Sequence, residues 1–188
     1  MQNRRQILKN AGGLGFGLAA ILRAPSVFSQ PTTIDGFHQQ DWFHETSFDL
    51  QKDIETAENN NKTLTLLWEQ KGCHYCEKMH KTVFQREDIV ELIKNEFLVV
   101  QMDYWGEREF RNFDGEMITE AEMARNYFVR GTPTTMFFDD IGDVLFRMPG
   151  YGEPPVFKAA FRYVHERAYI GQSFTKWIKT QNLDLDPA

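Results

Sequence analysis

The chain has 188 residues, 41% of them hydrophobic and 14% aromatic, which suffices for one domain with its own core. The formal net charge is −6, and an acidic surface argues against binding to nucleic acid or to anionic lipid. With only two cysteines, the chain cannot be a disulfide-rich scaffold or a zinc ribbon built on two cysteine pairs.

The first 29 residues carry the features of an export signal. Arg4-Arg5 precede a weakly apolar stretch over 11–22 that contains four glycines and is too short to span a bilayer. We expect residues 1–29 to be a twin-arginine-type export signal and residues 30–188 to be the mature, periplasmic domain. A disordered basic tail or an uncleaved anchor is the alternative. Cleavage removes four cations and no acid, so 17 basic and 27 acidic residues remain and the formal charge becomes about −10.

Hydrophobic periodicity and turn residues predict an alternation of helices and strands. The first predicted elements are a helix over 47–59 capped by Ser47, a strand over 64–68, helices over 73–83 and 88–96, and a strand over 97–102. An inserted hairpin over 104–118 then turns at Asp114-Gly115, and the capping box Thr119-x-x-Glu122 opens a helix over 119–128. Strands over 134–138 and 144–148 and helices over 154–169 and 173–180 complete the prediction. This order predicts an α/β fold with a small mixed sheet between helices.

The two cysteines stand three positions apart in Cys73-His74-Tyr75-Cys76, at the start of a predicted helix. Covalent haem attachment requires a histidine directly after the second cysteine, and Glu77 stands there. A structural disulfide across two residues would constrain the unfolded chain little. The pair therefore predicts thiol–disulfide chemistry, with a redox-active Cys73–Cys76 disulfide and neither a further cofactor nor a resident metal.

The expected helix gives the two sulfurs different roles. Cys73 would lie at the helix N-terminus, where free backbone N–H groups and the helix dipole stabilise a thiolate. Cys76, one turn further, would be buried and protonated until it resolves the mixed disulfide on Cys73. A protonated His74 would also favour the Cys73 thiolate and make the disulfide a stronger oxidant. The reaction can run in either direction.

A second motif follows the cysteines: Val129-Arg130-Gly131-Thr132-Pro133-Thr134, before the last hairpin and helix. The two motifs in this order resemble the thioredoxin-like family over about residues 46–170. The resemblance implies a thioredoxin fold: a central mixed sheet of four to five strands flanked by helices, with a small hairpin insertion before a cis-proline. The segment Leu66–Gly72, the insertion and Gly150-Tyr151 are similar to SoxW-like periplasmic thioredoxins, a group linked to sulfur-compound oxidation.

The resemblance implies further site residues. The Thr132–Pro133 bond would be cis and lie against the cysteines, with the Thr132 backbone free to pair with an extended substrate. Thioredoxins commonly keep a buried carboxylate six residues before the first cysteine, and Leu67 occupies that position here. Glu69 points to the same side of the strand and either replaces that acid or is a solvated residue at the strand end.

Three functions compete. The favoured one is an exported, monomeric reductase of protein or small-molecule disulfides that a membrane electron donor recharges. The second is a periplasmic oxidase that introduces disulfides. The third is a copper-binding carrier that uses Cys73, Cys76 and His80 as ligands.

Overall fold

The computed structural model describes residues 32–181, so the predicted export signal lies outside the described residues. The elements are β1 (Thr32–Ile34), β2 (Phe37–Gln39), α1 (Leu50–Asn59), β3 (Thr63–Glu69), α2 (His74–Thr82), α3 (Glu87–Glu96), β4 (Phe97–Asp103), β5 (Glu109–Arg111), β6 (Met117–Thr119), α4 (Glu120–Asn126), β7 (Thr134–Phe138), β8 (Val144–Pro149), α5 (Pro154–His165), the 3₁₀ helix η1 (Ala168–Ile170) and α6 (Phe174–Thr180). None of the helices within residues 32–181 has the length and apolar character required to cross a bilayer.

Four strands form the central sheet in the order β4-β3-β7-β8. Strand β3 runs parallel to β4 from Thr63 opposite Phe97 to Glu69 opposite Asp103. Strand β7 is antiparallel to both β3 and β8. The parallel pair requires a crossover, which α2 and α3 provide. The predicted mixed sheet is therefore confirmed, with four strands.

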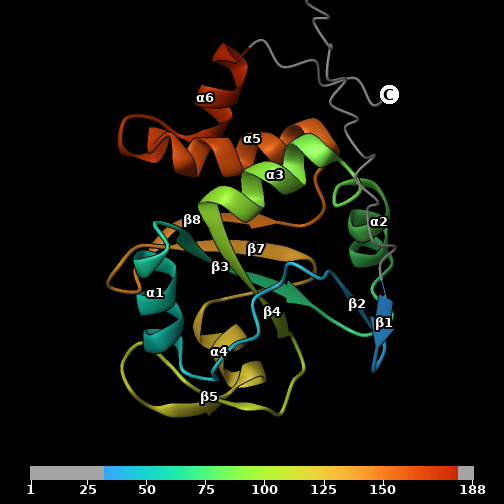
Figure 1. Cartoon of the computed structure of the whole chain (residues 1–188), viewed down its shortest axis with the longest axis vertical. Helices are drawn as coiled ribbons and strands as arrows, with labels where there is room; N and C mark the ends of the chain where they lie inside the picture. The colour runs from blue at the N-terminus through green and yellow to red at the C-terminus, as the bar shows by residue number, and fades with distance from the viewer. Residues whose placement is uncertain (1–31, 182–188) are drawn as a thin grey trace, which may run out of the picture.

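Helices cover both faces of this sheet (Figure 1). Helices α3 and α5 lie over one face and α1 and α4 over the other, each with its own apolar core. Side chains alternate along β3, so Leu67 belongs to the first core while Leu66 and Trp68 belong to the second. Because β3 is buried on both faces, most of its residues are apolar.

Two predicted helix ends were wrong. Helix α1 is capped by Asp49, whose carboxylate accepts the backbone N–H groups of Gln51 and Lys52, and not by Ser47. The Ser47 hydroxyl instead donates to Asp53. Helix α5 ends at His165, four residues early, because the backbone turns left-handed at Arg167 (φ 53°) and continues as η1.

The inserted hairpin is present as β5 and β6, with Gly115 at φ 84° in its turn. The Thr119–Glu122 capping box opens α4 as predicted. A second small hairpin, β1–β2, was not predicted; it turns at Asp35-Gly36 (φ 49° and 85°). An Asp-Gly pair between short strands is a hairpin signal. This N-terminal hairpin lies beside α2 (Figure 1).

Substitution of Phe137 tests the core. Its ring is fully buried and lies 4.9 Å from the ring of Phe161 and 5.6 Å from that of Phe97, measured between centroids. We expect Phe137→Ala to lower the free energy of unfolding by about 3–5 kcal/mol, because it leaves a cavity. Phe128, 68% exposed, is the control, and Phe128→Ala should change the stability by less than about 0.5 kcal/mol. Equal effects in chemical denaturation would contradict the assigned core.

Candidate active site

Cys73 and Cys76 form a disulfide with their Cα atoms 5.2 Å apart. Cys73 is the N-cap of α2, and its Sγ accepts the backbone N–H of Cys76 at 3.1 Å. Gly72 precedes it in the left-handed region at φ 71°, where a side chain would strain the turn into the helix. Cys73 is thus held where free N–H groups stabilise a negatively charged sulfur.

Thr132 supplies a second donor to the same sulfur. Its hydroxyl donates to Cys73 Sγ at 3.3 Å across 59 positions of sequence. The Thr132–Pro133 peptide bond is cis, the geometry that the resemblance implied. The Pro133 carbonyl accepts the N–H of Gly150 at 2.8 Å, which ties this loop to the end of β8. The structure therefore brings Cys73, Thr132 and Pro133 together.

The two sulfurs differ in access. Cys73 is half-buried, whereas Cys76 is only 3% exposed. A partner in solution can reach Cys73 first, and Cys76 lies behind it. This asymmetry fits an attacking outer sulfur and a resolving inner sulfur.

A cavity of about 280 Å³ opens beside the disulfide. Both cysteines line it, together with Glu69, His74 and the tip of the N-terminal hairpin at Gly36–His38. Such a volume has room for several water molecules, each of which occupies about 30 Å³ in the liquid. Cys76 and a carboxylate therefore line the same cavity.

Glu69 is buried, with 1% of its surface exposed, on the same face of β3 as Leu67. Its two carboxylate oxygens lie 3.1 and 3.2 Å from Nε2 of His80, and the Gln101 amide donates to one of them. The alternative of a solvated residue at the strand end is therefore wrong. Leu67 itself packs in the apolar core, so no carboxylate stands at the usual position.

His80 is fully buried, and its Nδ1 lies 3.0 Å from the Gln40 amide nitrogen at the end of the N-terminal hairpin. Between residues 32 and 181 the structure contains no group of three or more His, Cys, Asp or Glu side chains placed to hold a metal. His80 faces Glu69 instead of completing a site with the two cysteines. The copper-carrier hypothesis thus has no ligand cluster in this part of the chain.

The family is shown by sequence comparison. A family model described as a thioredoxin-like domain matches residues 50–165. The chain belongs to the thioredoxin-like domain family. With its bonded cysteine pair, it is a thioredoxin-like thiol–disulfide oxidoreductase.

Two solved structures illustrate the shared fold. A thioredoxin-fold protein from Helicobacter pylori is 23% identical with a TM-score of 0.57, and the match covers 64% of this chain and 82% of that one. A proposed disulphide-isomerase from Bacteroides thetaiotaomicron is 22% identical with a TM-score of 0.53, and covers 76% of this chain and 99% of its own. At these identities the likeness concerns the fold alone. No curated protein matches the chain.

In this thioredoxin-like domain His74 is exposed at the mouth of the cavity, where its ring meets that of Tyr75 edge-on at 5.6 Å. The nearby Glu77 carboxyl has a lowered pKa, mainly through its contact with Lys81 and to a smaller degree through His38 and His74. Water screens charges at such a position. The effect of His74 on Cys73 therefore stays a prediction.

Tyr75, which stands between the two cysteines in the sequence, belongs to an aromatic pair. The Tyr75 ring, 56% exposed, stacks 6.0 Å from that of Tyr151, and Lys78 lies 4.5 Å above the Tyr151 ring. The Tyr151 hydroxyl donates to Glu153 at 3.0 Å, while Lys78 donates to the same carboxylate at 2.6 Å. Burial raises the pKa of Tyr151, and the Lys78 contact lowers that of Glu153. Tyr75 and Tyr151 therefore present two aromatic rings beside the charged Lys78–Glu153 pair.

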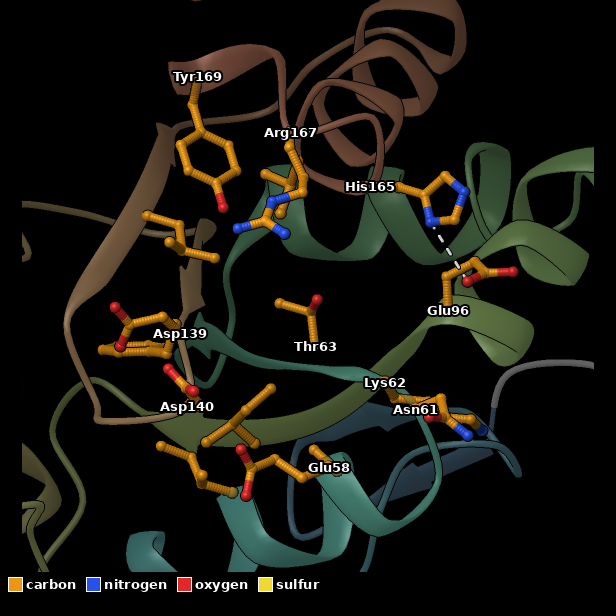
Figure 2. Close-up of a pocket in the computed structure, with 16 residues that line it drawn as sticks. Glu58, Asn61, Lys62, Thr63, Glu96, Asp139, Asp140, His165, Arg167 and Tyr169 are labelled. Carbon is orange, nitrogen blue, oxygen red and sulfur yellow. Dashed lines mark ion pairs between the residues drawn. The ribbon is translucent and has the colours of Figure 1, made fainter.

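A second cavity, of about 320 Å³, lies at the other end of β3. Figure 2 shows Arg167 and Tyr169 above Thr63, with Asp139 and Asp140 on the β7–β8 side and the His165–Glu96 ion pair nearby. Thr63 begins β3, and the cysteines follow its last residue, about 20 Å away at the rise of a strand. This cavity therefore lies apart from the cysteine pair.

The Thr132 hydroxyl can be tested by substitution with valine. In a Cys76→Ser background, where Cys73 is the only thiol, we expect Thr132→Val to slow iodoacetamide alkylation of Cys73 at neutral pH about tenfold. The reason is that a hydrogen bond to a charged group stabilises that group by about 1.5–3 kcal/mol. Thr56, whose hydroxyl bonds a carbonyl within α1, provides the control Thr56→Val. An unchanged alkylation rate in Thr132→Val would show that the hydroxyl does not stabilise the thiolate.

Proposed function

We propose that this protein is an exported thiol–disulfide oxidoreductase that works in the periplasm as a reductase of protein or small-molecule disulfides. One observation carries the proposal: the accessible Cys73 sulfur receives hydrogen bonds from the Cys76 N–H and the Thr132 hydroxyl, while Cys76 is buried behind it. Donors aimed at one sulfur favour its thiolate, which is the attacking species.

The reaction follows from this arrangement. The Cys73 thiolate attacks a substrate disulfide, a bond forms between Cys73 and one substrate sulfur, and the other leaves as a thiolate. Cys76 then loses its proton to Glu69 and attacks Cys73. The Cys73–Cys76 bond forms, the second substrate sulfur leaves, and two electrons have passed to the substrate. The backbone of Thr132, next to Pro133, pairs with the extended substrate segment.

Features of the sequence support the cellular setting of the proposal. The paired arginines and the short apolar stretch within residues 1–29 favour export by the twin-arginine route. In an oxidising compartment a reductase needs a source of electrons, and we infer a membrane electron donor and a monomeric protein. The similarity of Leu66–Gly72 and Gly150-Tyr151 to SoxW-like thioredoxins supports a role in sulfur-compound oxidation.

The same contacts also favour a second candidate, a disulfide-forming oxidase. Stabilising the Cys73 thiolate stabilises the reduced protein, which makes the disulfide a stronger oxidant. Against this, the insertion after β4 is the small hairpin β5–β6, which offers no helical surface for an unfolded client. We therefore favour the reductase.

Trapping tests the exchange reaction. Cys76→Ser should leave the mixed disulfide on Cys73 unresolved, because the second sulfur is missing. We expect this variant to accumulate stoichiometric adducts with glutathione disulfide by mass spectrometry, and covalent complexes with exported proteins in cells. Cys73→Ser is the control and should form none, since the remaining sulfur is buried. Equal trapping by both variants would contradict the assigned roles.

The reduction potential separates the two directions. For a reductase we expect a value near that of thioredoxin, about −270 mV, in equilibrium with a glutathione redox buffer. A value near that of DsbA, about −120 mV, would show that the oxidase is correct.

A further inference from the structure

A chain of polar side chains crosses the end of the sheet that leads to the cysteines. Gln39 donates to the Gln101 side chain at 2.5 Å, and Gln101 donates to the Glu69 carboxylate. Glu69 contacts His80, and His80 contacts Gln40. Gln39, the first member, belongs to the N-terminal hairpin, and Gln40, the last member, directly follows that hairpin. This segment is therefore connected to the carboxylate beside the cysteines from two directions.

The hydrogen bonds assign the proton on His80. The Gln40 amide nitrogen faces Nδ1, which must then accept, so the ring carries its hydrogen on Nε2. That N–H donates to Glu69. With the Gln101 N–H as a second donor, the buried carboxylate is held in place from two neighbouring elements.

The cavity defines where this carboxylate acts. Glu69 and Cys76 line the same space of about 280 Å³, and the tip of the N-terminal hairpin closes part of its wall. The ring of His38, on that hairpin, lies 5.4 Å from the ring of His80. His80 is buried and not among the cavity-lining residues, and its hydrogen bond toward the cavity is the one to Glu69.

We propose that His80 is a positioning residue that holds Glu69 as the proton acceptor for Cys76, and that Gln40, directly after the N-terminal hairpin, belongs to the redox site because it fixes the His80 tautomer. The proposal rests on the proposed function and names the residues that control its second step. In that step the Cys76 S–H proton passes through cavity water to Glu69, and the Cys76 thiolate displaces the substrate sulfur from Cys73. The proton then leaves to solvent or to the departing thiolate, so charge and protons balance.

The rate of this step should fall in acid, because protonated Glu69 cannot accept a proton. This falling part of the pH–rate profile is its acid limb. Removing the His80 donor destabilises the charged carboxylate, and the acid limb should move to higher pH. Other titratable groups surround the pair on neighbouring elements: His38 on β2, His74 and Glu77 on α2, Lys71 after β3 and Asp103 at the end of β4. They remain unchanged in the variants below, so a shift can be attributed to the pair.

The experiment follows the protein–glutathione adduct by acid quench and mass spectrometry after reduced protein is mixed with glutathione disulfide at a series of pH values. We expect Glu69→Gln to slow decay of the adduct about 100-fold and to abolish its acid limb, within the usual contribution of a general base. His80→Leu should move the acid limb to higher pH. His80→Gln keeps an N–H donor and should return the limb toward its wild-type position. Gln40→Ala should shift it in the same direction as His80→Leu, by less.

His44 provides a matched control. It is a half-buried histidine 3.3 Å from a buried carboxylate, Asp53, outside the cavity. His44→Gln should leave the acid limb unmoved even if it lowers stability. If the His80→Leu limb coincides with that of the wild type, or if His44→Gln shifts it equally, the inference is wrong. If wild-type protein forms no adduct and releases no glutathione, the proposed function itself fails.

Discussion

The double pairing of β3 is the constraint on which the rest of the structure depends. One edge of β3 bonds to β4 and the other to β7, so the strand is fixed in the middle of the sheet and its end has a defined place, while the helices on each side bury its two faces. Trp68 pairs with Thr134, which directly follows Pro133. This register puts the Thr132 loop opposite the turn that leads from β3 into α2. The contact between the Thr132 hydroxyl and Cys73 is therefore a consequence of sheet pairing, although 59 positions separate the residues.

The carboxylate stands at Glu69, two residues nearer to the cysteines than the usual position, which Leu67 fills. An unpaired buried carboxylate would be strongly destabilising. The fold supplies partners from two neighbouring elements: His80 from α2 and Gln101 from β4. His80 in turn needs a partner for Nδ1, and Gln40 provides it. Glu69, two positions from the usual site of the acid, is thus held by a polar network that joins four parts of the chain.

Signals that act over a few residues predicted most of the elements. Apolar periodicity located β3, β4, β7 and the helices, and the Thr119–Glu122 capping box opened α4 as expected. The start of α1 was misplaced because Ser47 and Asp49 can both cap a helix, and only the backbone geometry selects between them. The hairpin β1–β2 was missed because strands of three residues leave little periodicity.

The sequence by itself determined the reaction class and the order of the elements, because a cysteine pair, its spacing and the motif around Pro133 are local patterns. Strand alternation also placed Glu69 on the face of Leu67. Only the tertiary structure decided that Glu69 is buried, that His80 faces it, and that Gln40 and Gln101 complete the network. The physical reason is that glutamine and histidine side chains pair wherever folding brings donors and acceptors together, and no spacing along the chain marks such partners in advance.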